Sequence, residues 1–315
     1  MKPPEGASGA TLATQKKLLK LTRRRLERFV TLCPKILVND DPDTIHDLRV
    51  WSRRLQQAIR VLLPTPKPRK SKKVIRTLRR VRQSLGPCRN LDVNIALTME
   101  RCRHSGAAAL RQSWEAIQKD LEERRSSLLE GARYDISQQD IFAFIERAKS
   151  LIDDAGRNAD SHIPDLLHQL EEAAVEAMRA CDEACALAYE QRDQAHLHQF
   201  RIAAKRLRYR AELLVDLGHA KIKPLVEDLK DLQTALGDWH DRCVLLQYVA
   251  EFIARPEFLG DHPDMGRTLL SEMEKEKLRN ETAIEQLFQK AAKMRQSWAA
   301  WRPTAALVSD PSPGQ

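Results

Sequence analysis

The chain has 315 residues, which is enough for one large domain or for two of ordinary size. Aromatic residues make up 5% of it and glycines number 11, and this composition favours helices over strands. The formal charge is +9, but residues 16–89 hold 22 Lys and Arg against 5 Asp and Glu, so that this segment carries +17 and the rest −8. Such an uneven excess indicates a polyanionic partner.

The composition also excludes several classes of protein. No stretch approaches 18 apolar residues, so we expect no membrane span. The six cysteines are scattered without a Cys-x-x-Cys pair, and the first residues lack the apolar run of a secretion signal. We therefore expect a cytoplasmic protein with free thiols.

The hydrophobic pattern and the turn residues predict a series of helices between two disordered tails, 1–13 and 303–315. We expect helices over 14–33, 44–63, 68–85, 90–104, 108–130, 137–156, 164–191, 194–217, 221–236, 239–254 and 265–300. Pro34, Pro64 and the pair Gly86-Pro87 are the expected stops, and Asp43 is the expected N-cap of the second helix.

One basic motif, His-x-x-Arg-x-x-x-(Arg/Lys)-Arg-Leu, occurs twice. Residues 45–62 read IHDLRVWSRRLQQAIRVL and residues 197–214 read LHQFRIAAKRLRYRAELL, at an offset of 152. A later pair of segments, 78–93 and 229–244, matches at an offset of 151. Two matched segments in the same order predict an internally duplicated helical unit.

On a helix, residues three or four apart lie on the same side, so each copy of the motif has an apolar side and a cationic side. The first copy has its apolar side at Leu48, Trp51, Leu55, Ile59 and Leu62, and its cationic side at His46, Arg49, Arg53 and Arg60. The second copy has its cationic side at His198, Arg201, Lys205 and Arg208, where Glu212 ends the run. The 68–85 helix adds Lys72, Arg76, Arg79 and Arg80, and its counterpart in the second half has Lys230 at the Arg79 position but Glu227 at the Arg76 position.

Like charges at this spacing destabilise a helix slightly, and a bound anion would remove that cost. Arginine presents a planar fork to phosphate oxygens. A chain with one charge per phosphate releases counterions when it binds to such a cationic side, and this release favours binding. The two histidines allow two interpretations: phosphate donors that become cationic beside a polyanion, or helix-start residues bonded to a neighbouring backbone or carboxylate group.

The segment HDLRVWSRRLQQAIR, with LG-x-x-RN-x-DV after it and HQFRIAAKRLRY-x-AEL in the second half, resembles the CHAD family, the conserved histidine α-helical domain. The resemblance covers residues 14–302, with halves at 14–156 and 157–302. It implies an all-α fold of two pseudo-twofold-related four-helix bundles, with a basic surface or channel between them. Trp51 departs from the family motif, which usually has a small residue there.

The resemblance also implies non-enzymatic binding of inorganic polyphosphate and targeting to polyphosphate granules. No strands of the kind found in a fused CYTH domain are apparent, so we expect a standalone domain. The predicted polyphosphate-binding residues are His46, Arg49, Arg53, Arg54, Arg60, Lys72, Arg76, Arg79, Arg80, His198, Arg201, Lys205, Arg206, Arg208 and Lys230.

Three other functions stay open, and the weakest is a scaffold that dimerises through coiled-coil contacts of the Glu- and Arg-rich helices at 108–156 and 265–300. The pairs His46-Asp47 and His240-Asp241 suggest a His-Asp type metal-dependent phosphohydrolase, but their spacing to other ligands matches no metal pattern. A nucleic-acid-binding helical protein would show aromatics among its basic residues, and the cationic sides have none. A nucleotide-binding glycine loop and a Cys/His zinc cluster are absent from the sequence, so we expect no cofactor and no enzyme.

Overall fold

The computed structural model describes residues 5–63, 69–157 and 166–301, and within these ranges the chain forms helices and no strand. The predicted tail at 303–315 lies outside the described residues. The elements are α1 Glu5–Val38, α2 Pro42–Leu62, α3 Arg69–His104, α4 Ala108–Ser137, α5 Ile141–Arg157, α6 Leu166–Gln191, α7 Gln194–Asp216, η1 Ala220–Ile222, α8 Lys223–Ile253, α9 Pro256–Asp261 and α10 Pro263–Trp301. The all-α class is therefore confirmed. No helix in the described ranges combines the length and apolar character that a bilayer span requires.

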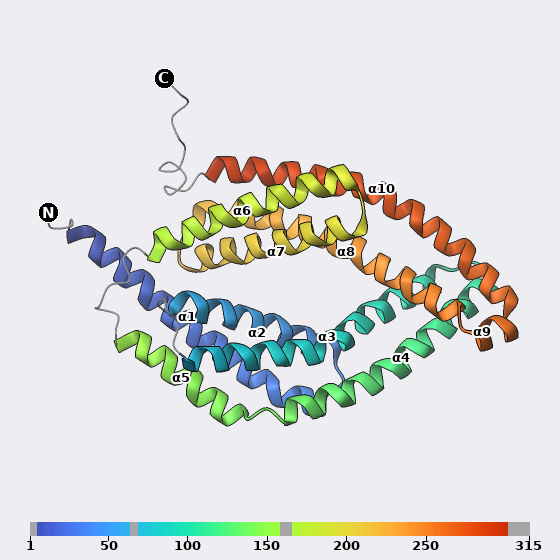
Figure 1. The fold of residues 1–315 in the computed structure, drawn as a ribbon, viewed down its shortest axis with the longest axis horizontal. Coiled ribbons are helices and arrows are strands. Elements are labelled where there is room, and N and C mark those ends of the chain that lie inside the picture. Colours follow the sequence, from blue (N-terminus) through green and yellow to red (C-terminus); the bar gives the residue numbers. More distant parts are fainter. Residues whose placement is uncertain (1–4, 64–68, 158–165, 302–315) are drawn as a thin grey trace, which may run out of the picture.

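The helices form one group in each half of the chain (Figure 1). In the first half α2 and α3 pack with α1 and α5, and in the second half α7 and α8 pack with α6 and α10. The predicted pair of four-helix groups is thus present, whereas the duplication itself and a channel between the groups stay predictions.

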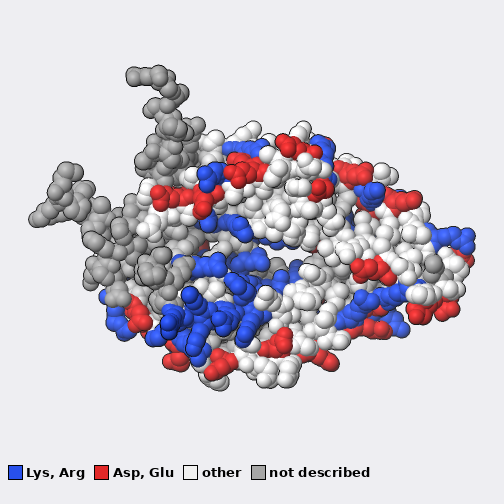
Figure 2. All heavy atoms as spheres, viewed as in Figure 1, with Lys and Arg blue, Asp and Glu red and all other residues white. Residues whose placement is uncertain are grey.

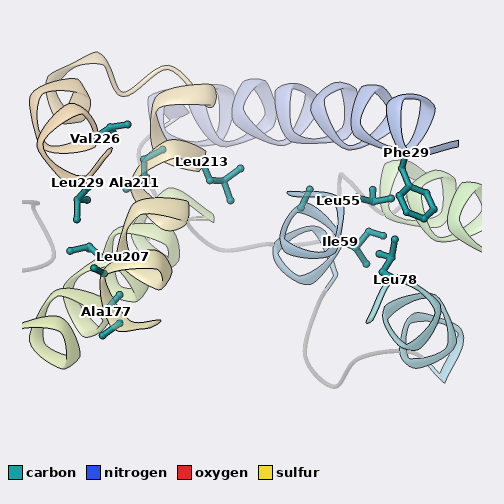
Figure 3. Packing of buried hydrophobic residues seen from close by; sticks show 14 of the residues in the cluster. Phe29, Leu55, Ile59, Leu78, Ala177, Leu207, Ala211, Leu213, Val226 and Leu229 are labelled. Atoms are coloured by element: carbon teal, nitrogen blue, oxygen red, sulfur yellow. The ribbon is translucent and has the colours of Figure 1, made fainter. Parts of the chain in front are cut away.

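The apolar sides predicted from the motif form the core of each group. Leu55 and Ile59 of α2 meet Phe29 of α1, and Leu207 of α7 lies against Leu229 of α8 (Figure 3). All five side chains are fully buried. Burial of each aliphatic or aromatic side chain stabilises the fold by about 1.5–3 kcal/mol. This packing therefore turns the apolar sides of α2 and α7 toward the core and leaves their cationic sides for other contacts.

A second apolar cluster joins the two halves at the far end of the long helices. Leu91, Trp114 and Leu121 from α3 and α4 pack with Val249 and Leu269 from α8 and α10. Between this joint and the two main groups lies a hollow, and Lys and Arg side chains gather at its border (Figure 2). The distant joint therefore holds the halves around an open space.

Two predicted helix breaks are wrong. α3 runs without interruption through Gly86-Pro87 and bends near its middle (Figure 1), and α8 runs through Gly237. Pro87 removes one backbone donor and bends a helix, but the buried Leu85 and Cys88 on either side keep the chain in register with the core. Tertiary packing thus overrides the local stop signal.

The ends of the first helices also differ from the prediction. α1 continues past Pro34 because Ile36, in the next turn, is fully buried. α1 also begins at Glu5 instead of Thr14, since the Ala-rich stretch from Ala7 extends the helix. The N-cap of α2 is Asp41, not Asp43, because Pro42 at the first helical position needs no donor and Asp41 accepts from the next two amides.

Candidate anion-binding site

The cationic sides of the two motif helices meet at Tyr209. Arg53 of α2 donates to the Tyr209 hydroxyl of α7 at 2.8 Å, and its guanidinium lies 5.5 Å from the ring centroid. Arg208 of α7 contacts the same ring at 5.0 Å. Because the ring is 9% exposed, a buried tyrosine holds two arginines from different halves of the chain side by side.

Arg49 is held in place by the bent part of α3. Its Nη1 donates to the backbone carbonyl of Arg82 at 2.5 Å, in the turn before Pro87. Gly86 permits this approach, because a Cβ atom there would lie 3.3 Å from the same Nη1. Arg82 in turn donates to Gln56 of α2. These hydrogen bonds therefore hold Arg49 of α2 against the bent part of α3.

We call six side chains around this contact the cationic cluster: Arg49, Arg53, Arg82, Arg201, Lys205 and Arg208. Arg53 influences the pKa values of Arg49, Arg82, Arg201 and Lys205, which places it at the centre. In the described part of the chain, only Arg208 of the six forms an ion pair, at 3.6 Å from Glu212. The cluster is thus a concentration of positive charge with little internal neutralisation.

Burial has a clear electrostatic consequence in the cluster. It lowers the pKa of Lys205 to about 7, with Arg201 and Arg53 adding to the effect. It also lowers the pKa of Arg82 to about 10, again helped by Arg53. Asp241 works in the opposite direction on Lys205, but burial raises the pKa of that carboxyl group. Lys205 and Arg82 are therefore costly to keep charged in the absence of an external anion.

Three buried nitrogen atoms in this region lack a hydrogen-bond partner. The Nε atoms of Arg201 and Arg208 and the Nδ1 atom of His240 are buried and make no hydrogen bond within the described chain. Buried polar atoms in proteins almost always have partners. An anion with several oxygens would supply the missing acceptor at Arg201 and could approach Arg208 Nε more closely than Glu212, which lies 3.6 Å away.

The two motif histidines lie at the edge of the cluster. His198 packs against His240, with ring centroids 5.3 Å apart. Burial and then neighbouring cations, Arg89 for His46 and Arg201 for His198, lower both pKa values. Neither ring makes a hydrogen bond to a described residue, which argues against the interpretation as helix-start residues bonded to a neighbour.

The predicted residues do not all lie together. Five belong to the cluster, and Arg60 and Arg79 adjoin it, since both lower the pKa of Arg82. Arg54 and Lys230 line a separate cavity between α1, α2, α7 and α8. Arg80 faces a groove between α3 and α4. Three further predicted residues are exposed on the surface: Lys72, Arg76 and Arg206.

Sequence reasoning missed Tyr209, Arg82 and Arg89. Arg82 follows Arg79 by three residues, so helical spacing could have included it. Tyr209 has no local signal, because its partner, Arg53, is 156 residues away in the sequence. The described residues contain no group of three or more His, Cys, Asp or Glu side chains able to hold a metal ion.

These features define an all-helical protein with a cationic cluster where its two halves meet. The chain belongs to the CHAD domain family, whose model matches residues 20–250. A search of the curated proteins finds no match.

Two solved structures share the fold. The CHAD domain from the plant Ricinus communis has a TM-score of 0.64 and 17% identity, covering 89% of this chain and 91% of its own. PptA from Streptomyces chartreusis has a TM-score of 0.61 and 14% identity, covering 90% and 99%. At such low identity the likeness concerns the fold alone.

Proposed function

We propose that this protein binds inorganic polyphosphate at the cationic cluster and leaves the polymer chain intact. The observation that carries the proposal is the buried Nε donor of Arg201, which has no acceptor, within a group of cations of which only Arg208 is ion-paired among the described residues. A linear chain with one charge per phosphate offers both the oxygens and the charge that this group lacks.

The contacts of Tyr209 favour polyphosphate over nucleic acid. Proteins that bind unpaired bases stack them on accessible aromatic rings. Tyr209 is the aromatic residue at the cluster, and among its contacts with Arg53 and Arg208 it is only 9% exposed, which is too little for a base to stack on its ring. Polyphosphate has no bases and therefore does not need an accessible aromatic ring.

The hollow between the two halves suggests a path for the polymer. Lys and Arg side chains gather at its border in Figure 2, and Arg53 of the first half contacts Tyr209 of the second half. We infer that a polyphosphate chain enters this space and replaces the hydration of the cluster. Membership of the CHAD family supports the same ligand, and location at polyphosphate granules would follow from this affinity.

Competition between polyphosphate and duplex DNA of equal phosphate content tests which polyanion the protein prefers. We expect polyphosphate to bind more tightly at every ionic strength, because its smaller cross-section lets it reach the buried donors. Tighter binding of DNA across the salt range would contradict the proposal.

A measurement of orthophosphate release tests whether the protein hydrolyses polyphosphate. We expect the length of the polyphosphate to stay constant during incubation with the protein, with or without added Mg²⁺, Mn²⁺ or Zn²⁺. Production of orthophosphate that follows the protein through purification would instead favour the phosphohydrolase.

A further inference from the structure

A separate cavity lies between α1, α2, α7 and α8 and has a volume of about 540 Å³, within the usual range for small-ligand sites. Its lining shares no residue with the cationic cluster. Two predicted polyphosphate-binding residues, Arg54 and Lys230, lie here instead. We therefore consider a different kind of ligand for this cavity.

The wall of the cavity is partly aromatic and apolar. Trp51 is half-buried, and the guanidinium of Arg54 lies 5.2 Å from its ring centroid. Leu21, Val215 and Val226 complete the apolar part. The indole N–H makes no hydrogen bond to a described residue. An indole in such a wall offers a flat surface and a free donor, which suit an aromatic ring with acceptor atoms.

Three carboxylates also line the cavity, and each is already paired. Asp216 lies 2.6 Å from Arg25, Glu227 lies 2.8 Å from Lys230, and Glu212 pairs with Arg208. Arg25 is 5% exposed and also donates to the backbone carbonyl of Arg54, so it is a fixed part of the wall. These carboxylates would repel a bare phosphate chain but accept hydrogen bonds from hydroxyl or amino groups.

Three cations of the lining have no such partner. Arg24, Arg54 and Lys223 form no ion pair with a carboxylate in the described part of the chain. They come from α1, α2 and α8, so they surround the opening from three helices. Phosphate oxygens would find two arginine forks and one ammonium group there.

We propose that this cavity binds a nucleoside polyphosphate, with the base against Trp51 and the phosphates at Arg24, Arg54 and Lys223. The carboxylates of Glu212 and Glu227 accept hydrogen bonds from ribose hydroxyl or base amino groups. The inference does not rest on polyphosphate binding at the cationic cluster.

The second copy of the motif has no aromatic residue at the position of Trp51. At the offset of 152 residues that matches the two motif copies, Ala203 takes the place of Trp51. Ala203 is buried and offers no aromatic surface. The large side chain that departs from the family motif therefore supplies the aromatic part of the cavity wall, and Ala203 supplies none.

Titration of the full chain with ATP, with inorganic tripolyphosphate and with adenosine tests the proposal by calorimetry and by tryptophan fluorescence. We expect ATP to bind about tenfold more tightly than tripolyphosphate, because base stacking on an aromatic side chain adds to the phosphate contacts. ATP binding should persist when the cluster is saturated with long-chain polyphosphate. Equal affinity for ATP and tripolyphosphate, or full displacement of ATP by polyphosphate, would overturn the proposal.

Variants assign the effect to the cavity. Trp51→Ala should remove the preference for ATP over tripolyphosphate, and Trp51→Phe should keep most of it. Arg54→Ala should weaken ATP binding several-fold, whereas Arg179→Ala, an exposed arginine of α6, should not. Circular dichroism and thermal unfolding establish that each variant is folded. Unchanged ATP binding in Trp51→Ala would refute the assignment, and if Trp51→Ala does not fold, unchanged ATP binding in Arg54→Ala would refute it.

Discussion

Lys205 illustrates the conflict between stability and binding at the level of single residues. Burial and the neighbouring Arg201 and Arg53 lower its pKa to about 7, from an ordinary value of 10.5. The folded protein therefore holds a lysine that is only partly charged near neutral pH. A polyanion in the cluster would reverse this, since nearby negative charge favours the protonated form.

Lys205→Met should stabilise the free protein and weaken polyphosphate binding. One pKa unit corresponds to about 1.4 kcal/mol, and after screening by water we expect a gain of about 1–3 kcal/mol in the free energy of unfolding at pH 6. Because the folded-state pKa is the lower one, the cost of Lys205 is complete below about pH 7, declines as the pH rises, and vanishes above 10.5.

Urea unfolding of both proteins at pH 6 and at pH 9 measures this difference. The advantage of Lys205→Met should be smaller at pH 9 than at pH 6. An advantage that is independent of pH would show that the gain comes from apolar packing instead of from the charge.

The two halves of the cluster should contribute unequally. Arg49→Ala combined with Arg53→Ala removes two permanent charges and the link to Tyr209, whereas Arg201→Ala combined with Lys205→Ala removes one permanent and one partial charge. We expect the first pair to reduce the affinity for polyphosphate more, by severalfold. Fluorescence anisotropy with labelled polyphosphate measures both, and equal losses would refute the asymmetry.

At the scale of the helices, the bend in α3 links backbone geometry to the site. Gly86 lies where a Cβ atom would come within 3.3 Å of Arg49 Nη1, whereas nothing lies within 4 Å of a Cβ atom at Gly237 in α8. The two positions correspond in the sequence pattern but differ in what surrounds them.

Gly86→Ala should therefore displace Arg49 and reduce polyphosphate affinity several-fold. Gly237→Ala is the matched control: it should raise the free energy of unfolding by about 0.5–1 kcal/mol, the helix preference of alanine over glycine, and leave binding unchanged. Calorimetry and urea unfolding measure the two effects. Unaltered binding in Gly86→Ala would mean that the contact between Arg49 and α3 is unimportant for the site.

The helices also show which parts of the fold are readable from sequence. The stripe of Leu48, Leu55 and Ile59 predicted the buried side of α2, because helical periodicity alone determines which residues share a side. The stop at Pro87 was wrong because the decisive contacts come from distant helices. Local signals describe the faces of a helix better than they describe its ends.

At the scale of the whole molecule, the site depends on contacts far apart in the sequence. The motif identified Arg53 and Arg201 as cations but could not show that Tyr209 joins their helices, nor that Arg54 lies in another cavity. The packing of α3 and α4 against α8 and α10 then keeps the halves around the hollow. Long-range geometry of this kind has no local sequence signal.

The salt dependence of polyphosphate affinity tests the central claim most directly. We would measure the dissociation constant of long-chain polyphosphate from about 50 to about 300 mM salt, for the wild type and for Arg53→Gln combined with Arg201→Gln. Binding at the cluster predicts that the logarithm of the affinity falls steeply with the logarithm of the salt concentration. In the double variant this slope should be shallower by about 1–2, because two phosphate contacts are lost. An identical slope and affinity in the two proteins would show that polyphosphate binds elsewhere.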